Sequence, residues 1–360
     1  MDVVSTFKEL VAIDSPSGSE EKMRNWLISW ATKRKLAVVV DAVGNLIIKK
    51  SAKQMTPFFL CAHMDTVEPG RNIKPQIKNR LICSDGTTIL GADNKAALAA
   101  ILAASDEWIR TSNLGIELVF TVKEETGGGA EFFDRSVLLN QIGFIFDHAA
   151  PLGGIIMSAP FITNFKVEFL GKAAHSCFPK KGRNPVHFAA DFMKSLQYGE
   201  TNEKQTFVNI GIISGGSVVN AVPEKIVLEG EVRSFSENHF LERLHLIETN
   251  VITIGKKYPE IKHSFEKSGY CPGYQHHPAS SQVKYIKKIF TTLHLKPTMH
   301  TTFGISDANS LCSMGLQVIS LSDGVVDPHT TKERVAISDL EKMKEIILLM
   351  FATPLSKVAA

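Results

Sequence analysis

Four short apolar runs of the sequence each lead directly into acidic or imidazole side chains. The runs have the length and continuous hydrophobicity of strands that are buried on both faces, and they comprise Phe58–Ala62, Leu118–Val122, Phe144–Phe146 and Val318–Leu321. Helical patterns separate several of the runs, notably the alanine-rich stretch Asn94–Trp108. Apolar strands that alternate with helices predict an α/β fold, with a mostly parallel sheet covered by helices. Another helix is expected after Ser17–Glu20, whose sequence is typical of a capping box.

The polar residues that follow the apolar runs are expected to lie close together. In an open α/β sheet the ligand crevice lies beyond the carboxyl ends of the strands. The side chains that reach this edge are His63 and Asp65, Glu124 and Glu125, Asp147 and His148, and Asp323 with Asp327 and His329. A convergent cluster of carboxylates and imidazoles predicts a metal site at the edge.

Taken one at a time, these motifs also have ordinary structural explanations. His63 and Asp65 share one face of an extended strand, which is also typical of a structural hydrogen-bonded pair. The adjacent carboxylates of Glu124 and Glu125 also suit a solvated turn. Asp93, which precedes the alanine-rich helix, also suits a helix N-cap. The single motifs leave these alternatives open.

The middle of the chain has a different pattern from the rest. Between Pro160 and the Cys271-Pro272-Gly273 turn, the pattern runs strand, helix, strand, strand, helix, strand, which is the order of a ferredoxin-like α+β unit. We therefore expect residues 161–271 to form an inserted domain. Residues 1–160 and 272–360 are expected to form one larger, discontinuous domain that carries the metal site.

The composition argues against several other classes of protein. The 40 Lys and Arg residues balance 37 Asp and Glu residues without a basic run, so no nucleic-acid partner is expected. The longest apolar stretch, Ile346–Ala352, is far too short to span a bilayer, so no membrane partner is expected. Five scattered cysteines without a C-x-x-C pair argue against a thiolate zinc site and a disulfide framework, and they favour a cytoplasmic location. No G-x-G-x-x-G motif follows the early strands, which argues against a nucleotide-binding dehydrogenase.

A series of ordered motifs extends these observations along the chain. They are Gly91-Ala92-Asp93-Asn94-Lys95, Glu124-Glu125-Thr126-Gly127, Gly171 to Ser176, Asn220-Ala221-Val222-Pro223, Ser306-Asp307-Ala308-Asn309 and Pro328 to Val335. Together they resemble the dinuclear zinc metallopeptidase family of peptidase T, glutamate carboxypeptidase, aminoacylase and succinyl-diaminopimelate desuccinylase. The motifs around Glu124 and Asp147 are most similar to peptidase T-like members. One position departs from the family pattern, because Asn94 stands where the family often has a second aspartate.

The resemblance implies a site for two divalent metal ions per chain. One ion would be bound by His63, Asp93 and Asp147, and the other by Asp93, Glu125 and His329, so that Asp93 bridges them. The charges agree with this arrangement, since two divalent cations balance three carboxylates and one bridging hydroxide. Oxygen and imidazole ligands suit zinc, cobalt or manganese, and the family favours zinc. Glu124 resembles the general base that takes a proton from the water shared by the two metals, which leaves the metal-bridging hydroxide, and returns the proton to the leaving amine. Asp65 resembles the partner that orients His63.

The resemblance also makes the inserted domain a lid and dimerisation domain. In it, His175 resembles the donor that stabilises the transition state at the metals of the other subunit in a homodimer. Arg233 and Asn220 resemble substrate-binding residues, with Arg233 on a substrate carboxylate. A surface ion pair of Arg233 with Glu229 or Glu231 is the alternative.

The sequence therefore predicts an enzyme, a dinuclear metallopeptidase or amidohydrolase that cleaves an amide bond of short peptides. Aminopeptidase activity of the peptidase T type is favoured. Carboxypeptidase activity and deacylation of N-acyl amino acids are the alternatives within the family. A non-catalytic metal-binding dimer is disfavoured, because the metal ligands and the general base are all present.

Overall fold

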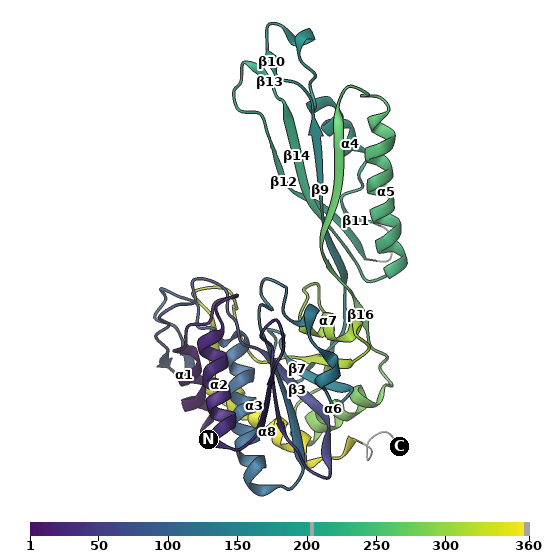
Figure 1. Ribbon diagram of the computed structural model, residues 1–360. Coiled ribbons are helices and arrows are strands. Elements are labelled where there is room, and N and C mark those ends of the chain that lie inside the picture. The colour runs from purple at the N-terminus through teal and green to yellow at the C-terminus, as the bar shows by residue number, and fades with distance from the viewer. Residues whose placement is uncertain (202–204, 356–360) are drawn as a thin grey trace. The chain divides into compact units, whose positions relative to one another are not determined.

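The structure, a computed structural model, describes residues 1–201 and 205–355 (Figure 1). The chain divides into two compact units, a larger one formed by Met1–Ser158 with Gln275–Ala360 and a smaller one formed by Ala159–Tyr274. The predicted ends of the inserted domain, residues 161 and 271, lie within three residues of the ends of the smaller unit.

A nine-stranded sheet forms the centre of the larger unit in the described part of the chain. Its strands, in order across the sheet, are β1 (Ala37–Val40), β2 (Leu46–Lys50), β6 (Gly115–Thr121), β3 (Met55–His63), β7 (Ile142–Phe146), β18 (Gln317–Leu321), β8 (Gly154–Ala159) and β16 (Tyr274–Gln275), with β17 (Thr298–Thr301) also paired to β8. Strand β3 runs parallel to both β6 and β7, and β18 runs parallel to β7. Strands β1 and β2 form an antiparallel edge. The predicted mostly parallel sheet is confirmed.

Helices cover this sheet. In the described residues they are α1 (Val3–Val11), α2 (Glu21–Lys33), α3 (Ala92–Thr111), α6 (Ser281–Thr292), α7 (Asp307–Ser313) and α8 (Ile337–Ala352), with short 3₁₀ segments η1 (Ala130–Phe132) and η2 (Arg135–Val137). Helices α1, α3 and α8 pack against one another, and their apolar side chains share one core with Phe58, Leu60 and Leu118 of the sheet. Every residue of β6 is buried, so both faces of the sheet are covered at its centre. A small separate sheet joins β19 (Arg334–Ala336), β5 (Leu81–Cys83) and β4 (Gln76–Lys78).

The helix expected after Ser17–Glu20 is α2, but the predicted capping box is wrong. Glu20 itself occupies the N-cap, and its carboxylate accepts hydrogen bonds from the backbone N–H groups of Gly18 and Lys123. The Ser17 hydroxyl donates to Asp65 (2.6 Å). Both side chains therefore bind loops at the strand ends, and neither caps the helix in the expected way.

The smaller unit has the predicted ferredoxin-like order with one added strand. Its five-stranded antiparallel sheet has the order β11 (Gly199–Thr201), β12 (Thr206–Gly215), β14 (Lys225–Ser234), β9 (Phe161–Leu170) and β15 (Lys262–Cys271). Helices α4 (Val186–Ser195) and α5 (Glu237–Gly255) pack on this sheet. Strand β10 (Ala174–His175) pairs with β13 (Ala221–Val222), and a short 3₁₀ segment, η3 (Pro179–Lys181), follows β10. The ferredoxin-like part of the fold prediction is confirmed, and β11 extends the sheet beside β12.

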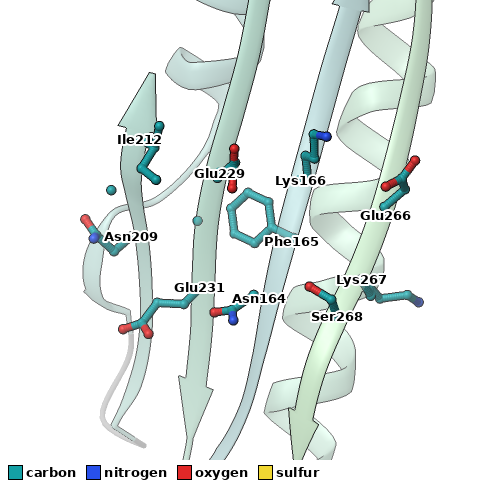
Figure 2. Close-up of a pocket in the computed structure, with 12 residues that line it drawn as sticks. Asn164, Phe165, Lys166, Asn209, Ile212, Glu229, Glu231, Glu266, Lys267 and Ser268 are labelled. Atoms are coloured by element: carbon teal, nitrogen blue, oxygen red, sulfur yellow. The ribbon is translucent and has the colours of Figure 1, made fainter. Parts of the chain in front are cut away.

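The two faces of this sheet differ in character. On the helix side, Phe169, Phe188 and Phe192 are fully buried in one core. The other face carries a shallow groove of about 440 Å³. Figure 2 shows that polar and charged side chains from four strands surround it, among them Lys166, Glu229, Glu231 and Glu266. Charges of both signs alternate across this open face.

Among residues 1–201 and 205–355, every helix falls short of the length or hydropathy that a membrane span requires.

Candidate metal centre

The ends of adjacent parallel strands bring the candidate ligands together. Strand β3 ends at His63, β6 leads into Glu124 and Glu125, and β7 leads into Asp147. Asp93 lies in the first turn of α3, which follows β5. Because β3 lies between β6 and β7 and is parallel to both, the three strand ends open onto the same edge of the sheet.

A first group consists of His63, Asp93 and Asp147. The Nε2 atom of His63 lies 3.2 Å from Asp93 Oδ1 and 3.6 Å from Asp147 Oδ1. One ligand atom from each of the three residues lies within 4.8 Å of the others. These are the residues predicted for one of the two metal ions.

A second group consists of Asp93, Glu125 and His329. The Nε2 atom of His329 lies 3.2 Å from Asp93 Oδ2 and 3.0 Å from Glu125 Oε1. These ligand atoms also lie within 4.8 Å of one another. Asp93 therefore directs Oδ1 to the first group and Oδ2 to the second, which is the arrangement a bridging carboxylate requires.

The charges in both groups fit bound cations. Hydrogen bonds to Asp93 and Glu125 raise the pKa of His329 to about 10. Burial favours the neutral form of His63, yet the carboxylates of Asp147 and Asp65 raise its pKa well above its ordinary value. Both imidazoles thus lie in an excess of negative charge, which bound cations would offset. Carboxylate oxygens with imidazole nitrogens form a donor set suited to divalent transition metals.

Asp65 is buried and contacts both His63 and the backbone of the two adjacent glutamates, Glu124 and Glu125. The Nδ1 atom of His63 lies 3.0 Å from the Asp65 carbonyl oxygen and 3.4 Å from the carboxylate. With a proton on Nδ1, the lone pair of Nε2 faces the cluster. The Asp65 carboxylate also accepts hydrogen bonds from the backbone N–H groups of Glu124 (3.0 Å) and Glu125 (3.2 Å). The sequence predicted the contact with His63 but not this connection to the adjacent glutamates.

Known proteins share the fold of this chain. The M20 profile described as "Peptidase dimerisation domain" matches residues 161–259. The crystal structure of a tripeptidase from Staphylococcus aureus superposes with a TM-score of 0.91 at 30% sequence identity, covering 98% of each chain. The chain belongs to the M20 peptidase family. Aminopeptidase PepT from Bacillus cereus ATCC 10987 also superposes with a TM-score of 0.91, at 29% identity over 98% of each chain. An uncharacterised protein of Bacillus subtilis (strain 168), YqjE, is 30% identical over 370 residues, which cover 96% of each chain.

Membership of the M20 peptidase family makes the chain an enzyme, a metallopeptidase or amidohydrolase. The two residue groups of the larger unit are candidates to hold metal ions.

Glu124 lies at the same cluster in this M20 peptidase. Its carboxylate also comes within 4.8 Å of ligand atoms of His63 and Glu125. Burial, reinforced by the charge of Asp147, raises the pKa of Glu124 well above its ordinary value. His63, Glu124 and Glu125 thus form a third group that could hold a metal ion. The first two groups are complete without Glu124, which leaves its carboxylate as a candidate for proton transfer.

Asn94 is a donor at the position where the family often has an acidic residue. Its Nδ2 atom donates to the carbonyl oxygen of Phe146 (2.6 Å) and to Asp147 Oδ1 (2.9 Å). An ionised aspartate would face two acceptors here, whereas the carboxamide binds both of them. In this M20 chain Asn94 therefore steadies Asp147.

Two further carboxylates are buried near the site: Asp307, for which no role was predicted, and Asp323, which was expected at this edge of the sheet without an assigned role. Burial raises the pKa of Asp307 to about 7, and it raises that of Asp323 well above its ordinary value. Asp307 accepts a hydrogen bond from the hydroxyl of Thr121, the residue paired with His63 across two strands. The sequence signals were the Ser306–Asn309 motif and the position of Asp323 after an apolar run.

The other three predicted residues, His175, Asn220 and Arg233, belong to the smaller unit. His175 is exposed, and its Nδ1 atom accepts a hydrogen bond from the backbone N–H of Cys177 (3.1 Å). The carbonyl oxygen of Asn220, the residue before β13, accepts from the N–H of Ser176 (2.9 Å), so Asn220 lies next to the end of β10 that carries His175.

Arg233 forms a two-point ion pair with Glu231. Its Nε and Nη2 atoms donate to Oε1 and Oε2 of that carboxylate, each at 2.9 Å. The alternative considered for Arg233, an ion pair on its own strand, is therefore present. Binding of a substrate carboxylate by Arg233 stays a prediction.

Proposed function

We propose that this M20 peptidase is an aminopeptidase for short peptides that works with two divalent metal ions per chain, with zinc as the favoured ion. The observation that carries the proposal is Asp93, which directs one carboxylate oxygen to each of two three-residue groups. The similarity to the aminopeptidase PepT and to the tripeptidase, each over 98% of the chain, supports a peptide substrate.

Glu124 is proposed as the general base. When bound, a pair of divalent cations would polarise a carbonyl group and lower the pKa of a water molecule. The Glu124 carboxylate takes a proton from the attacking water and returns it to the leaving amine. Asp65 supports this step through its hydrogen bond from the backbone N–H of Glu124.

Residues of the smaller unit are proposed to bind the peptide. Because Nδ1 of His175 accepts from Cys177, the proton of the neutral imidazole lies on Nε2, which can donate to the oxygen of the scissile carbonyl. Asn220 lies nearby, immediately before the neighbouring strand β13. Arg233 would exchange its partner Glu231 for the carboxylate of the substrate.

The substrate end that the enzyme recognises can be tested with matched peptides. With two metal ions loaded and counted by elemental analysis, the protein should cleave unblocked di- and tripeptides. Acetylation of the α-amine should abolish cleavage, because an aminopeptidase must recognise that group. Brisk hydrolysis of N-acetylated substrates would favour the deacylase, and a requirement for a free C-terminus alone would favour the carboxypeptidase.

We also propose that the chain acts as a homodimer. Strand β12 pairs with β11 only through Thr206–Val208, and in the described residues its remainder has a neighbouring strand on one side only. Ile212 and Ile213 on this open edge are 53% and 62% exposed. Exposed apolar strand edges are normally paired or protected, and the matched profile is that of a dimerisation domain.

A mixing experiment tests whether His175 serves the other subunit. Glu124→Gln and His175→Ala chains are each expected to be inactive, but after subunit exchange one site in each hybrid dimer would combine an intact Glu124 with an intact His175. Activity should therefore return if His175 acts across the interface. Exchange without recovered activity would refute the proposed action across subunits, and a fully active monomer would refute the need for a dimer.

The cytoplasmic location also stays a prediction.

A further inference from the structure

The carboxylate of Glu333 accepts three backbone hydrogen bonds from the segment that carries Asp93. Glu333 Oε2 accepts from the N–H groups of Leu90 (2.8 Å) and Gly91 (2.7 Å), and Oε1 accepts from the N–H of Asp93 (2.9 Å). The side chain of Glu333 is almost fully buried, with 1% exposed. Neither of the ligand groups includes it.

These three donors lie at the N-terminal end of α3, where no preceding helical turn can accept their hydrogen bonds. A buried carboxylate at this end satisfies the donors and interacts favourably with the helix dipole. Gly91 has a left-handed backbone conformation (φ 69°), and a Cβ atom there would lie 3.2 Å from the Thr66 side chain. The segment is thus confined on one side by Thr66 and bound on another by Glu333.

Glu333 also belongs to the loop of the second metal group. It lies four residues after His329, its N–H donates to the carbonyl oxygen of Thr330 (3.1 Å), and β19 begins at the next residue. Strand β19 is paired with β5, which fixes the end of this loop. The Glu333 carboxylate therefore connects the loop that carries His329 to the segment that carries Asp93. In these two segments, His329 Nε2 lies 3.2 Å from Asp93 Oδ2.

We propose that Glu333 is a positioning residue of the two-metal site. It fixes the backbone of Leu90–Asp93 so that Asp93 can present one oxygen to each ligand group. Glu333 itself contacts no ligand atom of either group, and it acts through the Asp93 backbone. This inference rests on the proposed function, because it concerns the residue that the two metal ions would share.

Glu333→Gln tests the proposal with little change in volume. A carboxamide has one oxygen, so it cannot accept on both sides as the carboxylate does. The affinity for the more weakly held metal ion should fall about 10- to 100-fold, as expected for a residue that orients a ligand. Chelator competition with zinc measures this affinity. In the metal-free protein, hydrogen exchange at the amides of Leu90, Gly91 and Asp93 should become faster.

Glu117→Gln is the matched control. Glu117 is also a buried carboxylate that accepts backbone hydrogen bonds, from Leu139 and Asn140, but the loop it binds precedes β7 and carries no ligand. Its variant should lose stability and keep both metal affinities. Equal loss of metal in the two variants would reduce Glu333 to a general structural role and overturn the proposal.

Two more results separate the failure of this inference from failure of the proposed function. A wild-type protein that binds two ions, with unchanged affinities in a folded Glu333→Gln variant, would overturn the positioning role alone. A wild-type protein that binds fewer than two ions would overturn the proposed function and this inference with it. If Glu333→Gln does not fold, Glu333→Asp keeps the charge on a shorter side chain, and its affinity for the weaker ion should still fall.

Discussion

The Asp93→Ala protein should lose at least one of the two proposed metal ions and, with it, nearly all peptidase activity. Asp93 supplies the carboxylate that both ligand groups share, with Oδ1 3.2 Å from His63 and Oδ2 3.2 Å from His329. Its removal deprives each group of one ligand and places two cations close together without the charge between them. Metal content per chain, measured after dialysis, checks this expectation directly.

Asp93→Asn makes the same experiment sharper. The side chain keeps its volume and one oxygen, but the second position becomes an amide group that cannot bind a cation. We expect this variant to retain one ion and lose the other. Two ions per chain in the Asp93→Ala protein would contradict the bridging role. Loss of both ions from Asp93→Asn would mean that the two groups do not bind independently.

That these residues lie close together could be predicted, because the ends of the strands determine where they lie. Apolar runs identified β3, β6 and β7, and parallel strands in one sheet end at a common edge. His63 is the last residue of β3, and Glu125 and Asp147 follow the ends of β6 and β7. The hydrophobic pattern alone therefore predicted that these three residues lie close together. The resemblance to known metallopeptidases then supplied their division into two groups.

The partners that orient the ligands could not be predicted in the same way. The hydrogen bonds from Glu124 and Glu125 to Asp65 depend on how the loop after β6 folds against the end of β3. Glu333 binds the Asp93 backbone from 240 residues further along the chain. Ser17, predicted as part of a capping box, instead donates to Asp65. Each of these contacts forms only when segments that are distant in the sequence pack together, so no local sequence pattern predicts it.

The elements that were not predicted differ in how strong a signal they carry. Helix α1 had a usable signal, because Val3, Phe7 and Leu10 recur at helical spacing and are buried. Strands β4, β5 and β19 are only three residues long. Such short strands are defined by their pairing partners, and β19 pairs with β5, which is far away in the sequence. The sequence therefore indicates the large sheet well and the small one hardly at all.

Glu124→Gln is expected to lower kcat by about 10²- to 10⁴-fold, the usual contribution of a general base, and to leave both metal ions in place. The glutamine keeps the size of the side chain but cannot take a proton from the attacking water. Neither ligand group needs Glu124, although its carboxylate lies within 4.8 Å of ligand atoms of His63 and Glu125. Single-turnover kinetics together with metal analysis measure the two effects separately.

Glu125→Gln provides the matched comparison, since it makes the same change at the next residue of the same loop. Glu125 Oε1 lies 3.0 Å from His329 Nε2 in the second group, so this variant should lose affinity for one ion. A Glu124→Gln protein that loses metal, beside a Glu125→Gln protein that keeps it, would reverse the two assignments. Loss of metal from both variants would mean that Glu124 is itself a ligand. The proton would then have to be taken up by another carboxylate, and Asp307 and Asp323, buried and with raised pKa values, would be the next residues to test.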